Sequence, residues 1–140
     1  MKKAKAKPID AALWKAFSIY IRVRDADENG VCKCFTCGRL TIWNKNTDCG
    51  HGIGRQHKAT KYNEKNNHAQ CKKCNGFEGG MREKYKEEMN KRYGGYTWEL
   101  MEIAARKSVK LGVNEIDTLT KQYENMANII IKNKGLKISN

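Results

Sequence analysis

The sequence predicts an α+β fold in which a cysteine-rich central core is flanked by an N-terminal helix and by C-terminal helices. Apolar residues recur at helical spacing near both ends, and four of the six cysteines form two Cys-x-x-Cys pairs in the middle. Only 39% of the 140 residues are hydrophobic and 31% are charged, so the hydrophobic core is thin. We expect one domain over 1–140, with a basic flexible tail at 1–9, a helix at 10–24, the core at 32–80 and a helical part at 81–140.

The N-terminal tail, "MKKAKAKPID", has the positive charge of a signal peptide, but no apolar stretch follows it. No run of the sequence approaches the roughly 18 apolar residues of a membrane-spanning helix. We therefore expect a cytoplasmic protein in a reducing compartment, where clustered cysteines bind a metal more often than they form disulfides.

The segment "DAALWKAFSIYIRVR" predicts the N-terminal helix, because its apolar residues share one face. Asp10 is a candidate N-cap, and the pair Asn29-Gly30 marks the turn after the helix. We expect Trp14 and the apolar face to belong to the hydrophobic core. The residues of that face are Leu13, Phe17, Tyr20 and Ile21.

The two cysteine pairs predict a structural zinc site. Cys34 and Cys37 in "CFTCG" are spaced to bind one ion, and Gly38 permits the tight turn of a zinc knuckle. Cys71 and Cys74 in "CKKC" supply the second pair of ligands, which completes the four-cysteine set of a closed tetrahedral Zn²⁺ site. Structural zinc contributes folding free energy directly, which suits a thin core.

Cys32 and Cys49 remain outside this set. Cys32 could replace Cys34 as a ligand, since "CKC" places both near the ion, but the knuckle favours Cys34. Cys49 is most simply a small buried residue. A redox dithiol protein is disfavoured, because it needs a Cys-x-x-Cys pair outside a metal site and none is spare.

Between the zinc pairs we expect a strand, a loop, a second strand and the start of a helix. The first strand lies in "RLTIWNKNTDCGHGI", around Ile42 and Trp43, and runs to His51. The loop is "GRQHKAT", the second strand is "TKY", and "NNHAQCKKCN" opens the helix. This order places His51, Asn66 and Asn75 around one small cleft.

Three further helices are expected in the C-terminal half. Helical spacing and glycine stops place them at about Met81–Tyr93, from Thr97 to Gly112, and at about Asn114–Asn133. Thr97 is the candidate cap of the second of these helices. The mixed charges of "MREKYKEEMNKR" indicate a solvated helix face.

The net charge of +13 indicates a partner of opposite sign. Lys and Arg number 28 against 15 Asp and Glu, and they are spread along the whole chain. A basic domain of this kind most often binds nucleic acid, because each phosphate contact releases counterions. The alternative is a surface that is kept soluble by its charge.

These motifs, taken in order, resemble a known family. "FSIYIRVRDA", "CFTCG", "DCGHGIGR", "NNHAQCKKCN" and "YGG" are similar to the NinG/Rap recombination proteins of lambda-like phages, over about Trp14 to Leu100. The spacing of His51, Asn66 and Asn75 also resembles the HNN form of the HNH, or ββα-metal, nuclease motif. The resemblance implies an HNH-type core and a metal-dependent DNA endonuclease.

The resemblance also implies roles for these residues. His51 matches the general base, and Asn66 matches the asparagine that holds the catalytic loop. Asn75 matches a ligand of a catalytic Mg²⁺ or Mn²⁺, which would polarise the scissile phosphate. Arg55 could clamp a phosphate oxygen.

One position departs from the family pattern. Many HNH nucleases carry a histidine or aspartate metal ligand just before the base, where this chain has Gly50. Asp48 is the first candidate to replace that ligand, followed by His68 and then His57. A helical spacing of seven residues from Asn75 supports His68, although a structural histidine bonded to backbone is the better reading of it.

Two function classes therefore stay open. The first is an endonuclease of phage recombination that acts on branched or single-strand-containing DNA, and the second is a zinc-stabilised nucleic-acid-binding module without cleavage. If four-way junctions are cut, a homodimer is expected, because paired nicks need two active sites. The apolar run Ile129–Ile131 is a candidate surface for it, or it packs on its own core.

Overall fold

The computed structural model describes residues 6–138, which form a mixed α+β fold of helices and two small two-stranded sheets. Of the predicted tail at 1–9, residues 1–5 lie outside the described part. The elements in order are α1 (Ala11–Asp25), β1 (Val31–Lys33), β2 (Leu40–Ile42), β3 (Thr47–His51), α2 (Lys58–Lys61), η1 (Glu64–Asn66), β4 (Asn67–Cys71), η2 (Lys73–Phe77), α3 (Arg82–Tyr93), α4 (Thr97–Ala105) and α5 (Val113–Lys134).

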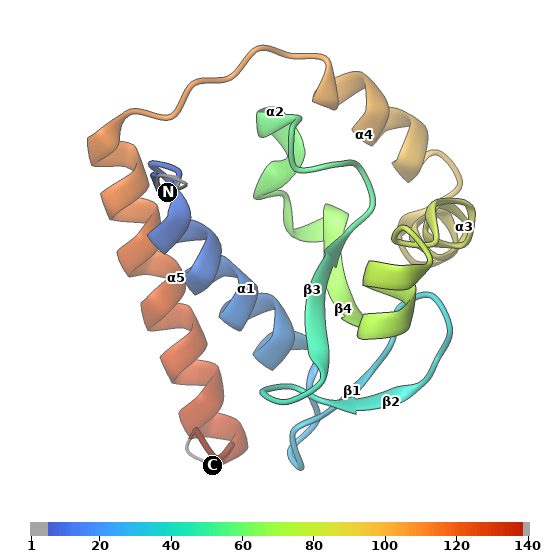
Figure 1. The fold of residues 1–140 in the computed structure, drawn as a ribbon, viewed down its shortest axis with the longest axis vertical. Coiled ribbons are helices and arrows are strands. Elements are labelled where there is room, and N and C mark those ends of the chain that lie inside the picture. Colours follow the sequence, from blue (N-terminus) through green and yellow to red (C-terminus); the bar gives the residue numbers. More distant parts are fainter. Residues whose placement is uncertain (1–5, 139–140) are drawn as a thin grey trace, which may run out of the picture.

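Helix α1 lies between α5 and the β3–β4 pair, and α3 and α4 lie on the other side of that pair (Figure 1). The predicted apolar face of α1 is buried, with Phe17 and Ile21 at its centre. Ala69 of β4 and Ala127 and Ile131 of α5 complete this first core cluster. The helix predicted at 10–24 is confirmed to within one residue at each end.

The antiparallel strands β3 and β4 hold the middle of the molecule. Their register sets Asp48 opposite Gln70, Gly50 opposite His68, and His51 opposite Asn67. The prediction of one continuous strand from Ile42 to His51 was wrong, because the chain turns between β2 and β3. Thr47 closes that turn by donating its hydroxyl to the Ile42 carbonyl at 2.8 Å.

The predictions for the next segment were also wrong in part. Residues predicted as the second strand, "TKY", fall in the short helix α2 and just after it, whereas "NHAQC", predicted to open a helix, forms β4. All five residues of β4 are buried, and pairing with β3 satisfies their backbone. The helix expected there is reduced to the π-helical turn η2.

Helices α3 and α4 form a second core cluster with the loop after β3. Tyr85, Met89 and Trp98 pack there against Ile53. Helix α4 ends at Ala105 rather than near Gly112, because the residues that follow are mostly exposed and bury too little to extend it.

The two predicted helix caps make no capping hydrogen bond. Helix α4 is instead capped from α3, where the Asn90 side-chain oxygen accepts from the Trp98 N–H at 2.8 Å, and Thr97 is already a helical residue. Asp10 does occupy the N-cap position of α1, but its carboxylate accepts from Lys61 and Tyr62, both at 2.6 Å. That pairing ties α1 to the segment around α2.

The third long helix, α5, matches its predicted range to within one residue at each end. Of the candidate dimer surface on it, Ile131 belongs to the core and Ile129 is exposed. Within residues 6–138, no helix combines the length and apolarity that crossing a membrane requires.

Candidate functional site

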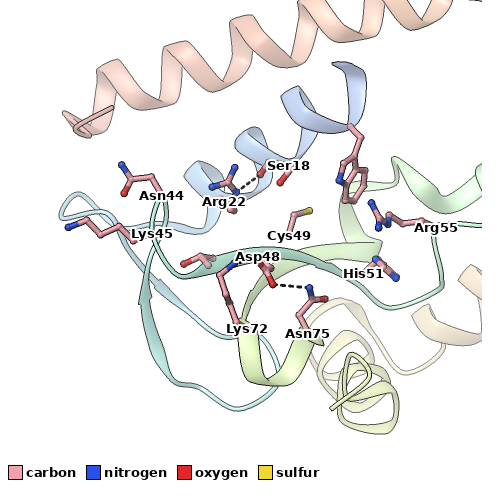
Figure 2. A pocket seen from close by; sticks show the side chains of 12 residues that line it. Ser18, Arg22, Asn44, Lys45, Asp48, Cys49, His51, Arg55, Lys72 and Asn75 are labelled. Carbon is pink, nitrogen blue, oxygen red and sulfur yellow. Dashed lines mark hydrogen bonds and ion pairs between the residues drawn. The ribbon is translucent and has the colours of Figure 1, made fainter. Parts of the chain in front are cut away.

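A polar cleft of about 430 Å³ opens between α1, β3 and the start of η2 (Figure 2). Among the described residues that line it, the cationic side chains are Arg22, Lys45, Arg55 and Lys72, and the one acidic side chain is Asp48. Four cations around one carboxylate favour a polyanion such as a nucleic-acid strand.

His51, at the end of β3, lines this cleft. Its ring is half-buried, and its Nδ1 atom is buried with no hydrogen-bond partner in the described part of the chain. Burial, and then the charge of Arg55, lower the pKa of His51 below its ordinary value. The ring is therefore neutral at pH 7, as a proton acceptor must be.

The backbone on both sides of His51 is held by buried groups. The hydroxyl of Tyr85 donates to the carbonyl of Gly50 at 3.0 Å, and the N–H of Gly52 donates to the carbonyl of Asn66 at 2.9 Å. Tyr85 and Asn66 are both fully buried, so this clamp is shielded from water. The backbone from which the imidazole projects is thereby held from the interior of the molecule.

The side chain of Asn66 closes the loop that follows His51. Its oxygen accepts from the Ile53 N–H at 2.8 Å, and its amide donates to the carbonyls of Ile53 and Thr60 at 3.0 and 3.1 Å. An asparagine suits this place because one acceptor and two donors meet one N–H and two carbonyls. Asn66 lies just before β4 rather than at the start of a helix.

Asp48 and Asn75 meet in the cleft, where the Asn75 amide donates to one Asp48 oxygen at 3.0 Å (Figure 2). Lys72 pairs with the other oxygen of Asp48. The side-chain oxygen of Asn75 makes no hydrogen bond within residues 6–138. Asp48 and Asn75 carry side-chain oxygens of the kind that Mg²⁺ binds, and in this structure both Asp48 oxygens are paired, one with Lys72 and one with the Asn75 amide.

Arg55 also reaches the cleft, from the loop after β3. Its guanidinium lies over the ring of Trp14, 4.6 Å from the ring centre. Trp14 is half-buried and lines the cleft as well as packing on the core, so its prediction as a core residue holds only in part. The stacking holds the positive charge of Arg55 near His51.

The other two histidines are not brought to this cleft. His68 is buried on β4, stacks on Phe35 with ring centres 3.9 Å apart, and lies 3.1 Å from the Lys65 carbonyl. Its proposed helical relation to Asn75 was wrong, because β4 is a strand. His57 is exposed and does not line the cleft.

The four cysteines of the predicted zinc set lie together beside η2. All four sulfur atoms are within 4.8 Å of one another, and those of Cys37 and Cys71 are 3.7 Å apart. A zinc ion at about 2.3 Å from each sulfur would set tetrahedral edges of about 3.8 Å. Within residues 6–138, no other group of three or more His, Cys, Asp or Glu side chains could hold an ion.

The surroundings of these sulfurs suit thiolates. Burial raises the pKa of the Cys34 thiol, but hydrogen bonds from the Thr36 hydroxyl and from backbone N–H groups outweigh it and bring that pKa to about 6. Burial and the adjacent sulfurs raise the pKa of Cys74 to about 12. Four thiols this close therefore need a cation before all can ionise, and Zn²⁺ fits them.

The two remaining cysteines are outside the cluster. The Cys32 thiol is buried and donates to the Arg22 carbonyl at 3.4 Å, so it does not replace Cys34. Cys49 is buried in the first core cluster, as expected.

Several residues of the cleft were not predicted from the sequence. Trp14, Ser18 and Arg22 recur every four residues on α1 and line the cleft together. That spacing was a usable signal, since it marks a second, polar face beside the apolar one. Lys45 and Lys72 carried no signal beyond their charge.

Comparison with known proteins gives one match. A family model described as Bacteriophage Lambda NinG protein matches residues 1–133, a longer stretch than the motifs alone suggested. Neither the curated proteins nor the solved structures contain a significant match to this chain.

Proposed function

The chain belongs to the family of the bacteriophage lambda NinG protein, and from this membership and the geometry of the cleft we propose a metal-dependent DNA endonuclease of phage recombination. The substrate class is DNA with branches or single-stranded parts. The observation that carries the proposal is the buried, unpartnered Nδ1 atom of His51 in a cleft lined by four cations.

In this proposal His51 is the general base. It accepts a proton from a water molecule that attacks phosphorus, and the bond from phosphorus to the 3′ oxygen breaks, which leaves a 5′ phosphate. A lowered pKa keeps the ring neutral, and the clamp by Tyr85 and Asn66 keeps it directed. Arg55 supports the reaction by binding a phosphate oxygen, since its charge lies close to His51.

Asp48 and Asn75 are the residues that would hold Mg²⁺ or Mn²⁺. When bound, such an ion polarises the scissile phosphate and stabilises the leaving oxygen. The ββα arrangement belongs to the same proposal, with β3, β4 and the short η2 in the places of the two strands and the helix. The order of His51, Asn66 and Asn75 along these elements supports it.

The second candidate is a zinc-stabilised module that binds nucleic acid without cutting it. Gly50 favours this candidate, because it offers no side chain at the place where HNH nucleases carry a metal ligand. The four-cysteine cluster and the basic cleft would serve either function.

Cleavage of linear, flapped and four-way DNA with Mg²⁺ or Mn²⁺, with EDTA as the metal-free control, separates the two candidates. We expect His51→Ala to lose about 10²- to 10⁴-fold in rate while folding, zinc content and DNA affinity stay near wild type. His57→Ala is the matched control, since His57 is exposed and outside the cleft. An unchanged rate in His51→Ala would remove His51 as the base, and a wild type that cuts no DNA would favour the binding module.

A further inference from the structure

A second, smaller hollow of about 160 Å³ continues from the cleft. His51 and Asn75 line both hollows and therefore mark where they join. Gly79, Gly80 and Arg82 also line the smaller hollow. The two hollows therefore adjoin at His51, and the four cations of the cleft line the larger one.

Phe77 lies close in sequence to residues of the smaller hollow, and it lines neither hollow itself. It lies in the turn between Asn75 and Gly79, and both of those residues line the smaller hollow. Its side chain is 89% exposed, more than any other large hydrophobic residue in the described part of the chain. An exposed aromatic ring near a candidate nucleic-acid site can stack on the face of a base.

The turn that carries Phe77 is tied at both ends. The Glu78 N–H donates to the Lys73 carbonyl at 2.9 Å, and the Gly80 N–H donates to the Cys74 carbonyl at 2.8 Å. The side chain of Gln70 donates to the carbonyl of Gly80 at 3.1 Å. Because Cys74 is a member of the four-cysteine cluster, the cluster anchors this turn.

The charges around the turn fit nucleic acid. Lys72 and Lys73 precede Phe77, Glu78 follows it directly, and Arg82 comes four residues after Glu78, so cations outnumber the one acidic residue of this segment. Cations bind phosphates, and an aromatic ring stacks on the face of a base. In a continuous duplex the neighbouring base pairs cover those faces, whereas an unpaired base at a flap or branch leaves its face open.

We propose that Phe77 stacks on an unpaired base next to the phosphate that lies at His51, and that this contact makes the protein prefer DNA with a single-stranded branch over continuous duplex. The inference deepens the proposed endonuclease function and rests on it for the position of the scissile phosphate. The stacking itself is a binding property, so it can be measured apart from cleavage.

The test uses zinc-loaded full-length protein and oligonucleotides with 2-aminopurine at the unpaired position beside a flap. Ca²⁺ replaces Mg²⁺ so that binding is measured without cleavage. Phe77→Ala should weaken binding to flapped DNA by about tenfold and binding to continuous duplex by less than about twofold. Phe77→Trp should retain the preference. Tyr96→Ala is the matched control, because Tyr96 is also exposed, at 77%, and lines neither hollow.

Fluorescence identifies the contact. Wild type and Phe77→Trp should change the 2-aminopurine signal, and Phe77→Ala should not. The inference is overturned if Phe77→Ala binds flapped DNA as wild type does, or if it weakens flapped and duplex DNA equally. A protein that shows the Phe77 contact but cuts no DNA with any divalent metal would refute the endonuclease and uphold the stacking. If the wild type cuts DNA and Phe77→Ala still prefers flapped DNA, the endonuclease is upheld and the stacking is refuted.

Discussion

Replacing Asn66 by alanine removes the side chain that closes the loop after His51. Three hydrogen bonds are lost, of 2.8, 3.0 and 3.1 Å, and they leave the Ile53 N–H, the Ile53 carbonyl and the Thr60 carbonyl without this partner in a buried site. The change therefore acts on both the stability of the fold and the direction of the base.

The magnitude follows from the number of bonds. Each contributes roughly 0.5–1.5 kcal/mol net, so Asn66→Ala should lower the free energy of unfolding by about 3 kcal/mol. That is a large part of the roughly 5–15 kcal/mol of a typical domain. Cleavage by the molecules that stay folded should fall by about 10- to 100-fold. An imidazole displaced by about 1 Å can still accept a proton but is no longer aligned with the attacking water.

Asn67→Ala is the matched control. Asn67 is equally buried, and its backbone pairing with His51 remains in alanine. Its amide donates to the carbonyls of Lys61 and Asn63 at 3.1 and 2.8 Å, and its side-chain oxygen accepts from the Cys49 thiol at 3.8 Å, so its side chain makes no hydrogen bond to the loop that Asn66 closes. It should lose stability by a similar amount per bond but cut DNA at about the wild-type rate. Urea unfolding gives the stability, and single-turnover cleavage at a temperature where both variants are folded gives the rate.

Two results would refute this reasoning. If Asn66→Ala unfolds at the wild-type urea concentration, the three bonds do not stabilise the loop. If Asn66→Ala and Asn67→Ala lose rate equally, the loss reflects general destabilisation, and Asn66 does not direct His51.

Three further predictions concern the metal, the charge and the pH. Metal analysis of protein purified without added metal should find about one zinc per chain, which Cys71→Ser should lose and Cys49→Ser should keep; a folded sample without zinc would contradict the site. If the four cations of the cleft each neutralise one phosphate, the logarithm of the DNA affinity should fall against the logarithm of salt with a slope of about −3 to −4, and a flat line would exclude phosphate contacts as the main contribution. Because burial and Arg55 lower the pKa of His51 from its ordinary 6.5, cleavage at saturating metal should decline as the pH falls, with a midpoint below 6.5. Arg55→Gln should move that decline to higher pH, and an unmoved midpoint would show that Arg55 does not act on the base.

The long helices could be predicted from the sequence because apolar spacing is reliable over four or more turns. α1, α3 and α5 all lie within one residue of their predicted ends. The clustering of the four cysteines was equally accessible, since two Cys-x-x-Cys pairs are the spacing typical of one shared metal site. In both cases the information is local to the segment that carries it.

The short elements between the two Cys-x-x-Cys pairs could not be predicted from local spacing. β4 has five residues, three of them polar. Over that length, the spacing of apolar residues does not distinguish a strand from a helix. Its conformation is decided by pairing with β3 and by the side chains that cover it, such as Phe35 on His68. The part that α1 plays in the cleft was missed for another reason: its spacing marks a face, but only the fold brings Arg22 to the Trp43 carbonyl, to which it donates at 2.8 Å from 21 residues away in sequence.

Gly50 illustrates how packing changes the meaning of a sequence feature. In the sequence its missing side chain is the main reason to doubt cleavage. In the structure, a Cβ atom at residue 50 would lie 1.8 Å from the side-chain oxygen of Gln70, so any larger residue there would force the Gln70 side chain to shift. Gln70 is fully buried and donates to the hydroxyl of Thr36, which contacts the Cys34 sulfur at 3.5 Å.

The side chain that a larger residue 50 would displace is thus the one that joins β4 to the loop of Cys34 and Cys37. Packing against Gln70 gives Gly50 a structural role, so its missing ligand does not by itself argue against a catalytic metal. An ion in the cleft would then depend on Asp48, which lies on the same strand two residues earlier, and on Asn75. Asp48→Ala should consequently abolish metal-dependent cleavage, whereas Asp48→Asn, which keeps one oxygen donor, should be partly restored by excess Mn²⁺.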